Sequence, residues 1–369
     1  EGQRMNENSI VLYPSNWLYN AGVVGFLRVL NEVALPVDFS EDGGVSLRIN
    51  NNDQDLIFGK WKEMSAENRI YGAKDAYYAN QTESCIRKRL ARFFEANASK
   101  AKKKTNFVCC FCTSKVQTTK SKAARLNQAF SNVLLGSEKS FSNTYWSNSA
   151  SDFVCPRCEF VLMCHHLGLT KLSDGSEAFI NAPSFKVMWC LNKLMREAFG
   201  SSSWEEGRRK RDVLAISLIE YALKVETTLG VWVEMNVEMV NKISYYDPEK
   251  KKTVTRIDFF TLPHEVVRLL RDRRVASLLS RIGEYSILNM FLDQDFSRLM
   301  ETGYRLLRVA LTPKNESKEV DKFIKRVLHL AKNRENPART AQYIFKLCAL
   351  VEEQRKRRDE YEWRDTGRI

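Results

Sequence analysis

Six of the nine cysteines in this chain fall between positions 109 and 164, and four of them form two C-x-x-C pairs. The pairs are Cys109 with Cys112 and Cys155 with Cys158. Each pair can fold into a tight turn with both thiolates facing one centre, and four thiolates make the closed tetrahedral site that structural zinc prefers. We therefore predict that these four cysteines bind a structural Zn²⁺.

Other assignments of the cysteines stay open. The odd number of cysteines and the lack of a secretion signal argue against a disulfide framework. The two pairs could be unrelated reduced thiols, Cys110 could compete with its neighbours, and Cys164, His165 or His166 could replace one ligand. A closed site of four cysteines has no position for water or substrate, so it would stabilise the fold and carry out no chemistry.

The sequence around the two pairs is similar, because Phe-Val precedes the first cysteine of each. This repeat is typical of two hairpins that each end in a metal-binding turn. The 42 residues from Thr113 to Val154 separate the pairs. A spacer of that length predicts an inserted subdomain that the metal closes at its base.

The formal net charge of +13 favours an anionic partner, and it is unevenly distributed. No acidic residue lies between Glu95 and Glu138, whereas the segment holds eight basic residues. We predict that they contact nucleic-acid phosphates, although a solvated loop would also explain the first four. They are Lys100, Lys102, Lys103, Lys104, Lys115, Lys120, Lys122 and Arg125. Residues 263–369 add a net charge of +7, from 23 basic and 16 acidic residues.

Hydrophobic spacing from Trp17 to Val33 predicts a core helix capped by Asn16 or Ser15. Gly22 and Gly25 inside it indicate a close approach of another backbone or a ligand, or packing of the helix on a sheet. We predict short strands in 35–60 around an Asp-Gly-Gly turn, and helices over 61–98, 179–199 and 213–223.

A strict alternation of apolar and polar residues from Val231 to Met239 predicts a strand. A turn at 245–250 and a returning strand at 253–262 would complete a hairpin. Its basic tip, Lys250, Lys251 and Lys252, could contact nucleic acid, and protection of a sheet edge by lysine is the alternative. After Pro263 we predict a bundle of helices over 266–282, 288–309, 320–332 and 341–358.

These elements predict an α+β fold: a mixed α/β body at the N-terminus, an inserted Cys₄ zinc subdomain and a C-terminal helical bundle. The expected division is 5–104 for the N-terminal α/β region and 105–170 for the zinc insertion. Residues 171–262 would continue the α/β body, and 263–369 would form the bundle.

No phosphate-binding G-x-x-x-x-G-K-[ST] loop, G-x-S-x-G nucleophile turn or H-E-x-x-H helix is present. We therefore expect a binding protein and no enzyme. A zinc-dependent nuclease that uses His165 or His166, and a zinc-stabilised scaffold protein without a nucleic-acid partner, are the alternatives. No membrane-spanning stretch and no signal peptide are found, so we expect a cytoplasmic protein without a membrane partner.

Several of these motifs together resemble a known family. The segment YPSNWLYNAG, residues 13–22, is similar to the opening of the type I-B CRISPR Cascade large subunit, a family named for its two C-x-x-C motifs. The resemblance covers roughly the first 170 residues. It continues through the first pair with Lys115, then Phe130, Leu135-Gly136, Phe141, Asn143 and Trp146, and through the second pair with Pro156 and Phe160 to Leu167-Gly168.

The resemblance implies a non-catalytic subunit of an RNA-guided complex. Its partners would be other Cascade subunits, a crRNA and target DNA with a PAM, and it would support strand opening (R-loop formation). A recruited helicase-nuclease, or transposition proteins in transposon-encoded relatives, would supply the output. Candidate base-edge contacts are Asn50, Asn51, Asn52 and Gln54, although an asparagine-rich turn is also an ordinary loop.

Overall fold

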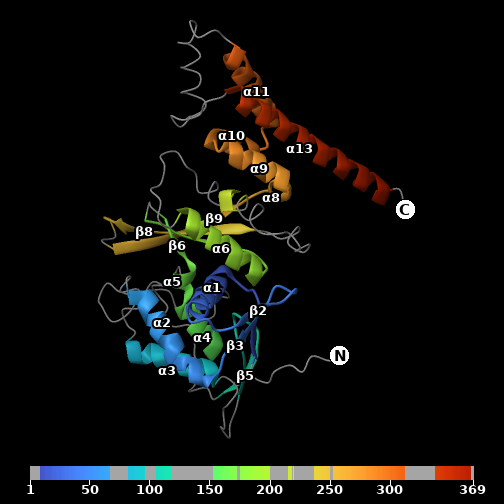
Figure 1. The fold of residues 1–369 in the computed structure, drawn as a ribbon. Coiled ribbons are helices and arrows are strands. Elements are labelled where there is room, and N and C mark those ends of the chain that lie inside the picture. The colour runs from blue at the N-terminus through green and yellow to red at the C-terminus, as the bar shows by residue number, and fades with distance from the viewer. Residues whose placement is uncertain are drawn as a thin grey trace. The chain divides into compact units, whose positions relative to one another are not determined.

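The computed structural model describes residues 9–66, 82–95, 105–118, 153–172, 175–199, 215–217, 219, 237–249, 252–311 and 337–366. The chain divides into two compact units (Figure 1). The first consists of Glu1–Arg196 with Met239–Phe259, and the second of Glu197–Glu238 with Phe260–Ile369. Helices and small sheets occur together, which confirms the α+β class. The four-part division expected from the sequence stays a prediction.

The core of the first unit is built around helix α1 (Trp17–Glu32), which is buried on nearly all sides. The side chain of Asn16 caps it by accepting hydrogen bonds from the backbone N–H groups of Leu18 and Tyr19, both at 3.1 Å. Residues 17–27 are apolar on nearly all sides, and such a helical segment must lie inside the protein. The predicted helix and its Asn16 cap are therefore confirmed.

Two glycines of α1 let other helices approach at backbone distance. A Cβ at Gly22 would overlap the carbonyl oxygen of Val161 in α4 (Pro156–Met163), and one at Gly25 would overlap the carbonyl oxygen of Cys164. Gly168, at the end of α5 (His165–Gly168), fits in the same way against Ala21. Of the explanations open from the sequence, close backbone approach is confirmed, and the neighbour is a helix pair.

Small sheets flank this helical core. Strands β1 (Ser9–Leu12), β3 (Val45–Arg48) and β2 (Val37–Phe39) form an antiparallel sheet in the order β1-β3-β2. The turn between β2 and β3 holds Gly43 at φ 87°, a conformation that favours glycine. A second sheet has the order β6-β7-β8-β9. Its strands are Thr170–Lys171, Glu177–Asn181, Glu238–Asp247 and Lys252–Thr261.

Helices α2 (Gln54–Ala66) and α3 (Glu83–Phe94) also contribute buried side chains to this unit. A one-turn helix, η1 (Asn51–Asp53), leads into α2, so the prediction of short strands in 35–60 is confirmed for β2 and β3 and wrong after residue 50. Arg89 of α3 pairs with the buried Glu159 of α4 at 2.9 Å, and Arg92 pairs with the same carboxylate at 3.1 Å. Phe26 contacts Phe93 and Phe160 through ring edges, which joins α1, α3 and α4.

The second unit is helical in its described part. Its helices are α8 (His264–Arg271), α9 (Arg273–Ile282), α10 (Tyr285–Leu292), α11 (Phe296–Leu311) and α13 (Pro337–Thr366). The helix predicted over 266–282 is split at Asp272, because its carboxylate caps α9 by accepting from the N–H of Arg274 at 2.8 Å. The helix predicted over 320–332 lies outside the described residues.

The boundaries of other predicted elements also differ from the structure, and the helix predicted over 288–309 is divided into α10 and α11. The helix predicted over 179–199 begins later: Glu177–Asn181 is the buried strand β7, and α6 spans Phe185–Phe199. The strand predicted over 231–239 is described only at its end, where β8 begins at Glu238 and extends into the predicted turn. Residues 231–236 lie outside the described part, and the returning strand β9 is close to its predicted range.

Candidate metal centre

The first C-x-x-C pair lies in the turn of a β-hairpin. Strands β4 (Thr105–Val108) and β5 (Lys115–Thr118) pair antiparallel, and residues 109–114 connect them. The N–H of Cys109 donates to the carbonyl of Ser114 at 3.0 Å, and Thr113 at φ 57° donates back to Cys109 at 2.9 Å. This turn brings Cys109 and Cys112 to the same end of the hairpin, as the sequence predicts.

The second pair lies at the N-terminus of a helix, so the expectation of a second hairpin is wrong. Cys155 is the N-cap of α4, and its Sγ accepts a hydrogen bond from the N–H of Cys158 at 3.4 Å. Pro156 follows at the first helical position, where its fixed φ suits a helix and no N–H is required. The N-terminus of α4 therefore lies beside both sulfurs of the second pair.

Backbone pairing joins the two pairs in spite of the 42 residues between them. Cys109 forms an isolated parallel bridge with Phe153, and the N–H of Cys110 donates to the carbonyl of Phe153 at 2.9 Å. The N–H of Cys155 donates to the Sγ of Cys109 at 3.3 Å. The similar Phe-Val sequences thus lie side by side, with the rings of Phe107 and Phe153 5.1 Å apart.

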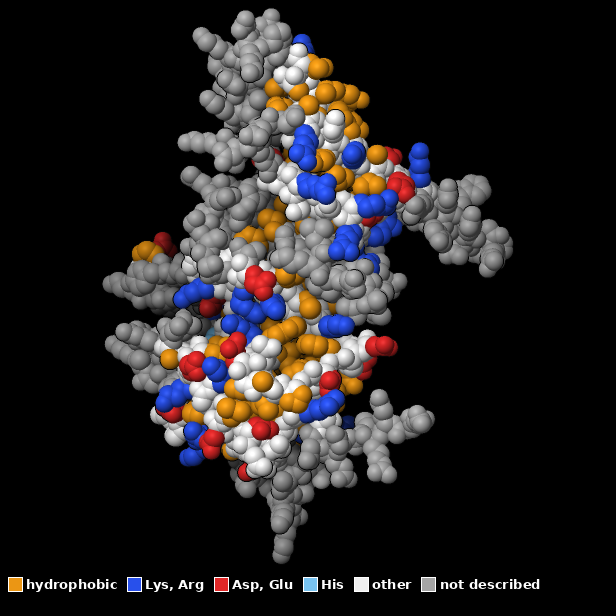
Figure 2. Space-filling view, in the orientation of Figure 1, with side chains coloured by type: hydrophobic (Ala, Val, Ile, Leu, Met, Phe, Trp, Pro, Cys, Tyr) orange, Lys and Arg blue, Asp and Glu red, His pale blue; other side chains and the backbone are white. Residues whose placement is uncertain are grey.

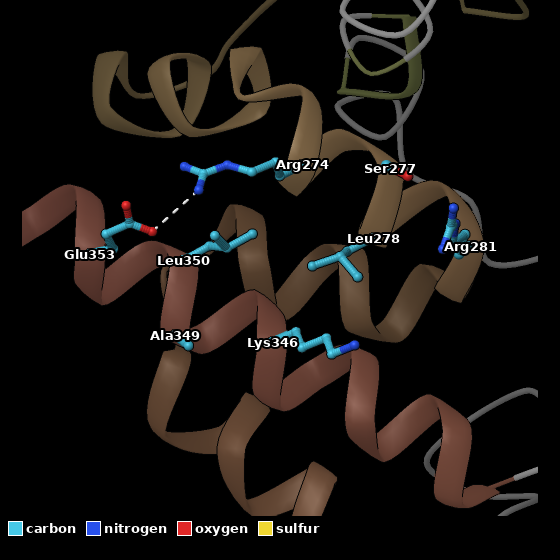
Figure 3. A pocket seen from close by; sticks show the side chains of 8 residues that line it. All are labelled: Arg274, Ser277, Leu278, Arg281, Lys346, Ala349, Leu350 and Glu353. Carbon is cyan, nitrogen blue, oxygen red and sulfur yellow. Dashed lines mark hydrogen bonds and ion pairs between the residues drawn. The ribbon is translucent and has the colours of Figure 1, made fainter.

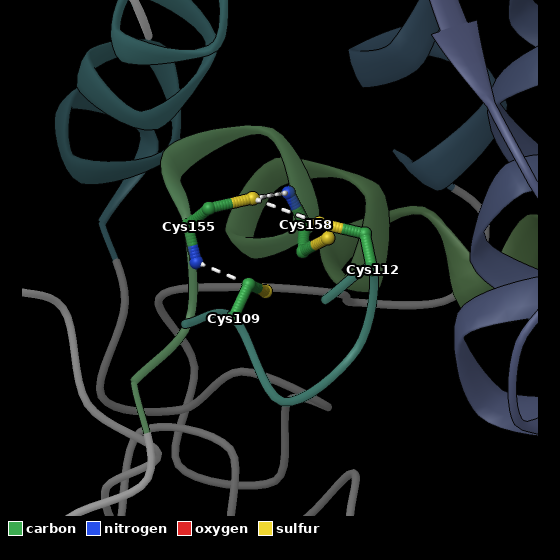
Figure 4. A group of neighbouring side chains, drawn as sticks. All are labelled: Cys109, Cys112, Cys155 and Cys158. Carbon is green, nitrogen blue, oxygen red and sulfur yellow. Dashed lines mark hydrogen bonds between the residues drawn. The ribbon is translucent and has the colours of Figure 1, made fainter. Parts of the chain in front are cut away.

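Figure 4 shows the four cysteine side chains converging on one point. Their sulfur atoms all lie within 4.8 Å of one another, and Cys112 Sγ and Cys155 Sγ are 3.7 Å apart. A tetrahedral zinc with sulfur ligands at about 2.3 Å requires sulfurs roughly 3.8 Å apart. All four are free thiols, and three of them are buried. The donor set and its spacing therefore fit a metal ion.

The four thiols influence one another's proton affinity. The pKa of Cys109 is lowered to about 7, because hydrogen bonds from Cys155 and Cys158 outweigh the raising effect of Cys112. Hydrogen bonds from Cys109, Cys155 and Cys158 lower the pKa of Cys112. Contacts with Cys109 and Cys112 raise the pKa values of Cys155 and Cys158. Some of the sulfurs thus lose their protons readily while the others keep theirs, and a bound cation would displace the protons that remain.

The alternative ligands lie elsewhere among the described residues. The group of side chains that could bind a metal consists of Cys109, Cys112, Cys155 and Cys158. It does not include His165 or His166. His165 Nδ1 lies 2.8 Å from the carbonyl oxygen of Leu162, and His166 Nε2 lies 3.0 Å from Ser65 Oγ. Cys164 is fully buried, and its thiol donates to the carbonyl of Phe160 at 3.6 Å. These side chains belong to the core between α1, α2 and α4.

The predicted nucleic-acid contacts are only partly described. Lys115 is exposed on β5, close to the cysteine cluster. The other basic residues of that stretch lie outside the described residues, as do Lys250, Lys251 and the side chain of Lys252. Asn50 caps η1: its side chain accepts from the N–H of Asn52 at 2.8 Å, and Asp53 accepts from the N–H of Asn50. Gln54 Nε2 donates to Asn51 at 3.2 Å.

The second unit contains a basic surface that the sequence pattern did not locate. A pocket of about 410 Å³ lies between α9 and α13. Figure 3 shows Arg274 bonded to Glu353 at 3.4 Å, with Arg281 and Lys346 at the other end of the pocket. Leu278, Leu350 and Ala349 give it an apolar floor. Figure 2 shows Lys and Arg side chains exposed over these C-terminal helices.

The sequence signal for this pocket was the seven-residue spacing of Arg274 and Arg281, which puts both on one face of a helix. Sequence spacing does not tell which helix that face meets. None of the described helices is long and apolar enough to cross a membrane.

Comparison of the chain with known protein families agrees with the cysteine geometry. No curated protein and no solved structure matches the chain. Residues 102–170 match the family described as CRISPR-associated protein (Cas_CXXC_CXXC), and this range contains both cysteine pairs and the segment between them. The match supports a CRISPR-associated protein family for this chain, with the two C-x-x-C motifs that name the family folded into one site.

Proposed function

We propose that the protein is the large subunit of a type I-B CRISPR Cascade complex. In this role it is non-catalytic, contacts PAM-containing duplex DNA and supports strand opening for interference or RNA-guided transposition. The observation that carries the proposal is the contact between the two segments that resemble the family. The opening segment and the first C-x-x-C turn are about 90 residues apart in the chain, yet they pack on each other.

Two contacts make this connection. Ser15 Oγ donates a hydrogen bond of 2.6 Å to the carbonyl of Phe111, which lies between the two cysteines of the first pair. The rings of Tyr19 and Phe111 stack with centroids 6.3 Å apart and an angle of 28° between their planes. The opening motif therefore has a local physical role, because it supports the cysteine turn.

We propose zinc as the metal at the four cysteines. Four thiolates at tetrahedral spacing are the donor set that structural zinc takes, and they leave no open position for a reaction. When bound, the ion would crosslink the hairpin turn to the N-terminus of α4. The residues between the two pairs would then form a loop that is closed by the metal at both ends.

DNA contact in this proposal relies on positive charge. Lys115 is exposed next to the cluster and belongs to the acid-free stretch of eight basic residues. In the second unit, Arg281 and Lys346 line a pocket whose acidic member, Glu353, is paired with Arg274. Cations on such surfaces bind phosphates without reading sequence. The guide RNA would supply sequence specificity by base pairing, and this subunit would read the short PAM.

The partners in this proposal are the other Cascade subunits, the crRNA and target DNA, in the cytoplasm. A recruited helicase-nuclease or transposition proteins would act afterwards. The burial of His165 and His166 favours this proposal over a zinc-dependent nuclease. A base or metal ligand that acts on DNA must be reached by the substrate, and these two side chains face the core.

A gel-shift series with purified protein and PAM-bearing duplex DNA at several salt concentrations tests the binding role. We expect the logarithm of the affinity to fall linearly with the logarithm of the salt concentration, since phosphate contacts release counterions. Replacing Lys102, Lys103 and Lys104 by alanine should make this slope shallower. No binding at physiological salt would favour the scaffold alternative, and metal-dependent cleavage that is lost in a His165→Ala, His166→Ala variant would favour the nuclease.

A further inference from the structure

The hydroxyl of Tyr19 is a buried polar group without a hydrogen-bond partner among the described residues. The side chain is fully buried in the middle of the first unit's core. An unpaired buried hydroxyl is destabilising, and native proteins rarely keep one without a reason. A hydroxyl in such a position can donate to an acceptor that forms when a ligand binds.

The ring of Tyr19 lies against the cysteine turn. It stacks on Phe111, whose carbonyl accepts the hydrogen bond from Ser15 one helical turn earlier. Tyr19 is thus held from two sides, by its own helix and by the turn that carries Cys109 and Cys112. The ring of Tyr19 therefore lies between α1 and the turn of the first cysteine pair.

The register between α1 and α4 indicates which cysteine lies level with Tyr19. Gly22 meets the backbone of Val161, and Gly25 meets that of Cys164, so both helices advance by three residues between contacts. Going back by three residues along each chain puts Tyr19 level with Cys158. One more step puts Asn16 level with Cys155, and these two residues are the N-caps of α1 and α4.

The electrostatics agree with this register. Burial raises the pKa of Tyr19 well above its usual value, and the charges of the cysteines raise it further, with Cys158 contributing most. The phenol therefore stays protonated beside the thiolates and can act as a donor.

We propose that the Tyr19 hydroxyl donates a hydrogen bond to the thiolate of Cys158 when a metal ion is bound, which makes Tyr19 a positioning residue of the metal centre. A metal replaces the thiol proton of Cys158, and the resulting thiolate is a much better acceptor. The hydrogen bond lowers the electron density on that sulfur and holds its side chain in the coordinating rotamer. The inference depends on a metal at the four cysteines and does not depend on the role in Cascade.

The test compares Tyr19→Phe with the wild-type protein and with the control Tyr13→Phe. The phenylalanine keeps the ring and its stacking on Phe111, so we expect the variant to fold. The hydroxyl of Tyr13 contacts Asp42 at the surface. In competition with a chelator, we expect Tyr19→Phe to bind Zn²⁺ about 10-fold more weakly, the usual effect of losing such a partner. The control should bind like the wild type.

The Co²⁺-substituted proteins provide a readout that packing alone does not move. Removing a hydrogen bond to a thiolate raises the energy of the sulfur electrons, so the sulfur-to-cobalt charge-transfer band of Tyr19→Phe should shift to longer wavelength. The metal-free variant should unfold at the same or a higher temperature than metal-free wild type, because an unpaired hydroxyl has been removed.

A charge-transfer band at the wild-type position would overturn the proposal, whether or not the affinity changes. In that case Tyr19 would serve only the packing of the core.

Discussion

Gly25 of α1 lies directly against the carbonyl of Cys164, at a separation that leaves no room for a Cβ. This contact fixes the distance between the opening helix and the segment that follows the second cysteine pair. The metal centre is therefore positioned by helix packing as well as by its own ligands.

Gly25→Ala should destabilise the protein by about 3 kcal/mol or more, since two backbones must move apart. Gly59→Ala is the matched control. Gly59 also lies inside a helix, but a Cβ there would meet nothing within 4 Å. The control should be neutral or gain up to about 1 kcal/mol from better helix propensity. Urea unfolding of both variants measures this difference, and equal stabilities would contradict the close packing.

Elemental analysis of cysteine variants tests the ligand set. Wild-type protein should hold about one zinc per chain. Cys112→Ser and Cys158→Ser should each lose most of it and unfold at a lower temperature. Cys110→Ser, Cys164→Ser and the exposed Cys85→Ser should keep it, because their sulfurs lie outside the group of four. Loss of zinc in Cys110→Ser or Cys164→Ser with retention in Cys112→Ser would show that the ligands are assigned wrongly.

The buried histidines should make the protein sensitive to acid. Burial, together with the charge of Lys242, lowers the pKa of His166 to about 3 and lowers that of His165 well below its usual value. Both groups gain their protons mainly in the unfolded state, so stability falls as the pH drops below about 6.5. Each histidine should contribute about 1.4 kcal/mol per pH unit in this range.

His166→Gln keeps a polar group near Ser65 and removes one of these protons. The slope of the unfolding free energy against pH, between pH 6.5 and 5, should be shallower in the variant by one proton. Since both proteins carry the same metal site, the difference isolates the histidine. Parallel slopes would mean that His166 is already protonated in the folded protein.

The pocket between α9 and α13 should contribute to DNA binding. Changing Arg281 and Lys346 to glutamate should weaken binding to duplex DNA and make the salt dependence shallower by roughly two phosphate contacts. Glu265→Lys is the control. It changes the charge in the opposite direction, at an exposed position of α8. Fluorescence anisotropy at several salt concentrations gives both quantities, and wild-type affinity and slope in the double variant would remove this surface from the binding site.

The sequence predicted the features that depend on short-range chemistry. Helix α1 with its Asn16 cap and the four clustered cysteines follow from local spacing and from the donor preference of zinc. The predicted start of α6 was wrong, because the apolar residues Phe179 and Ile180 fit a buried strand as well as a helix. The split at Asp272 was missed, since one carboxylate that caps a helix interrupts an otherwise continuous apolar face.

Other features depend on contacts that sequence spacing cannot give. The meeting of the two cysteine pairs depends on the pairing of Cys109 with Phe153 across the long spacer. The unpaired hydroxyl of Tyr19 and the approach of Gly25 to Cys164 depend on the register between two helices. That register is determined by tertiary packing and has no local signal.

The most direct test of the proposed function is to express the protein with its neighbouring genes and a CRISPR array, purify it under native conditions, and sequence the bound nucleic acid. The proposal predicts a stable complex with other subunits and an RNA that carries the array's repeat sequence. Purification of the zinc-loaded protein alone, with neither repeat-containing RNA nor other subunits, would contradict it.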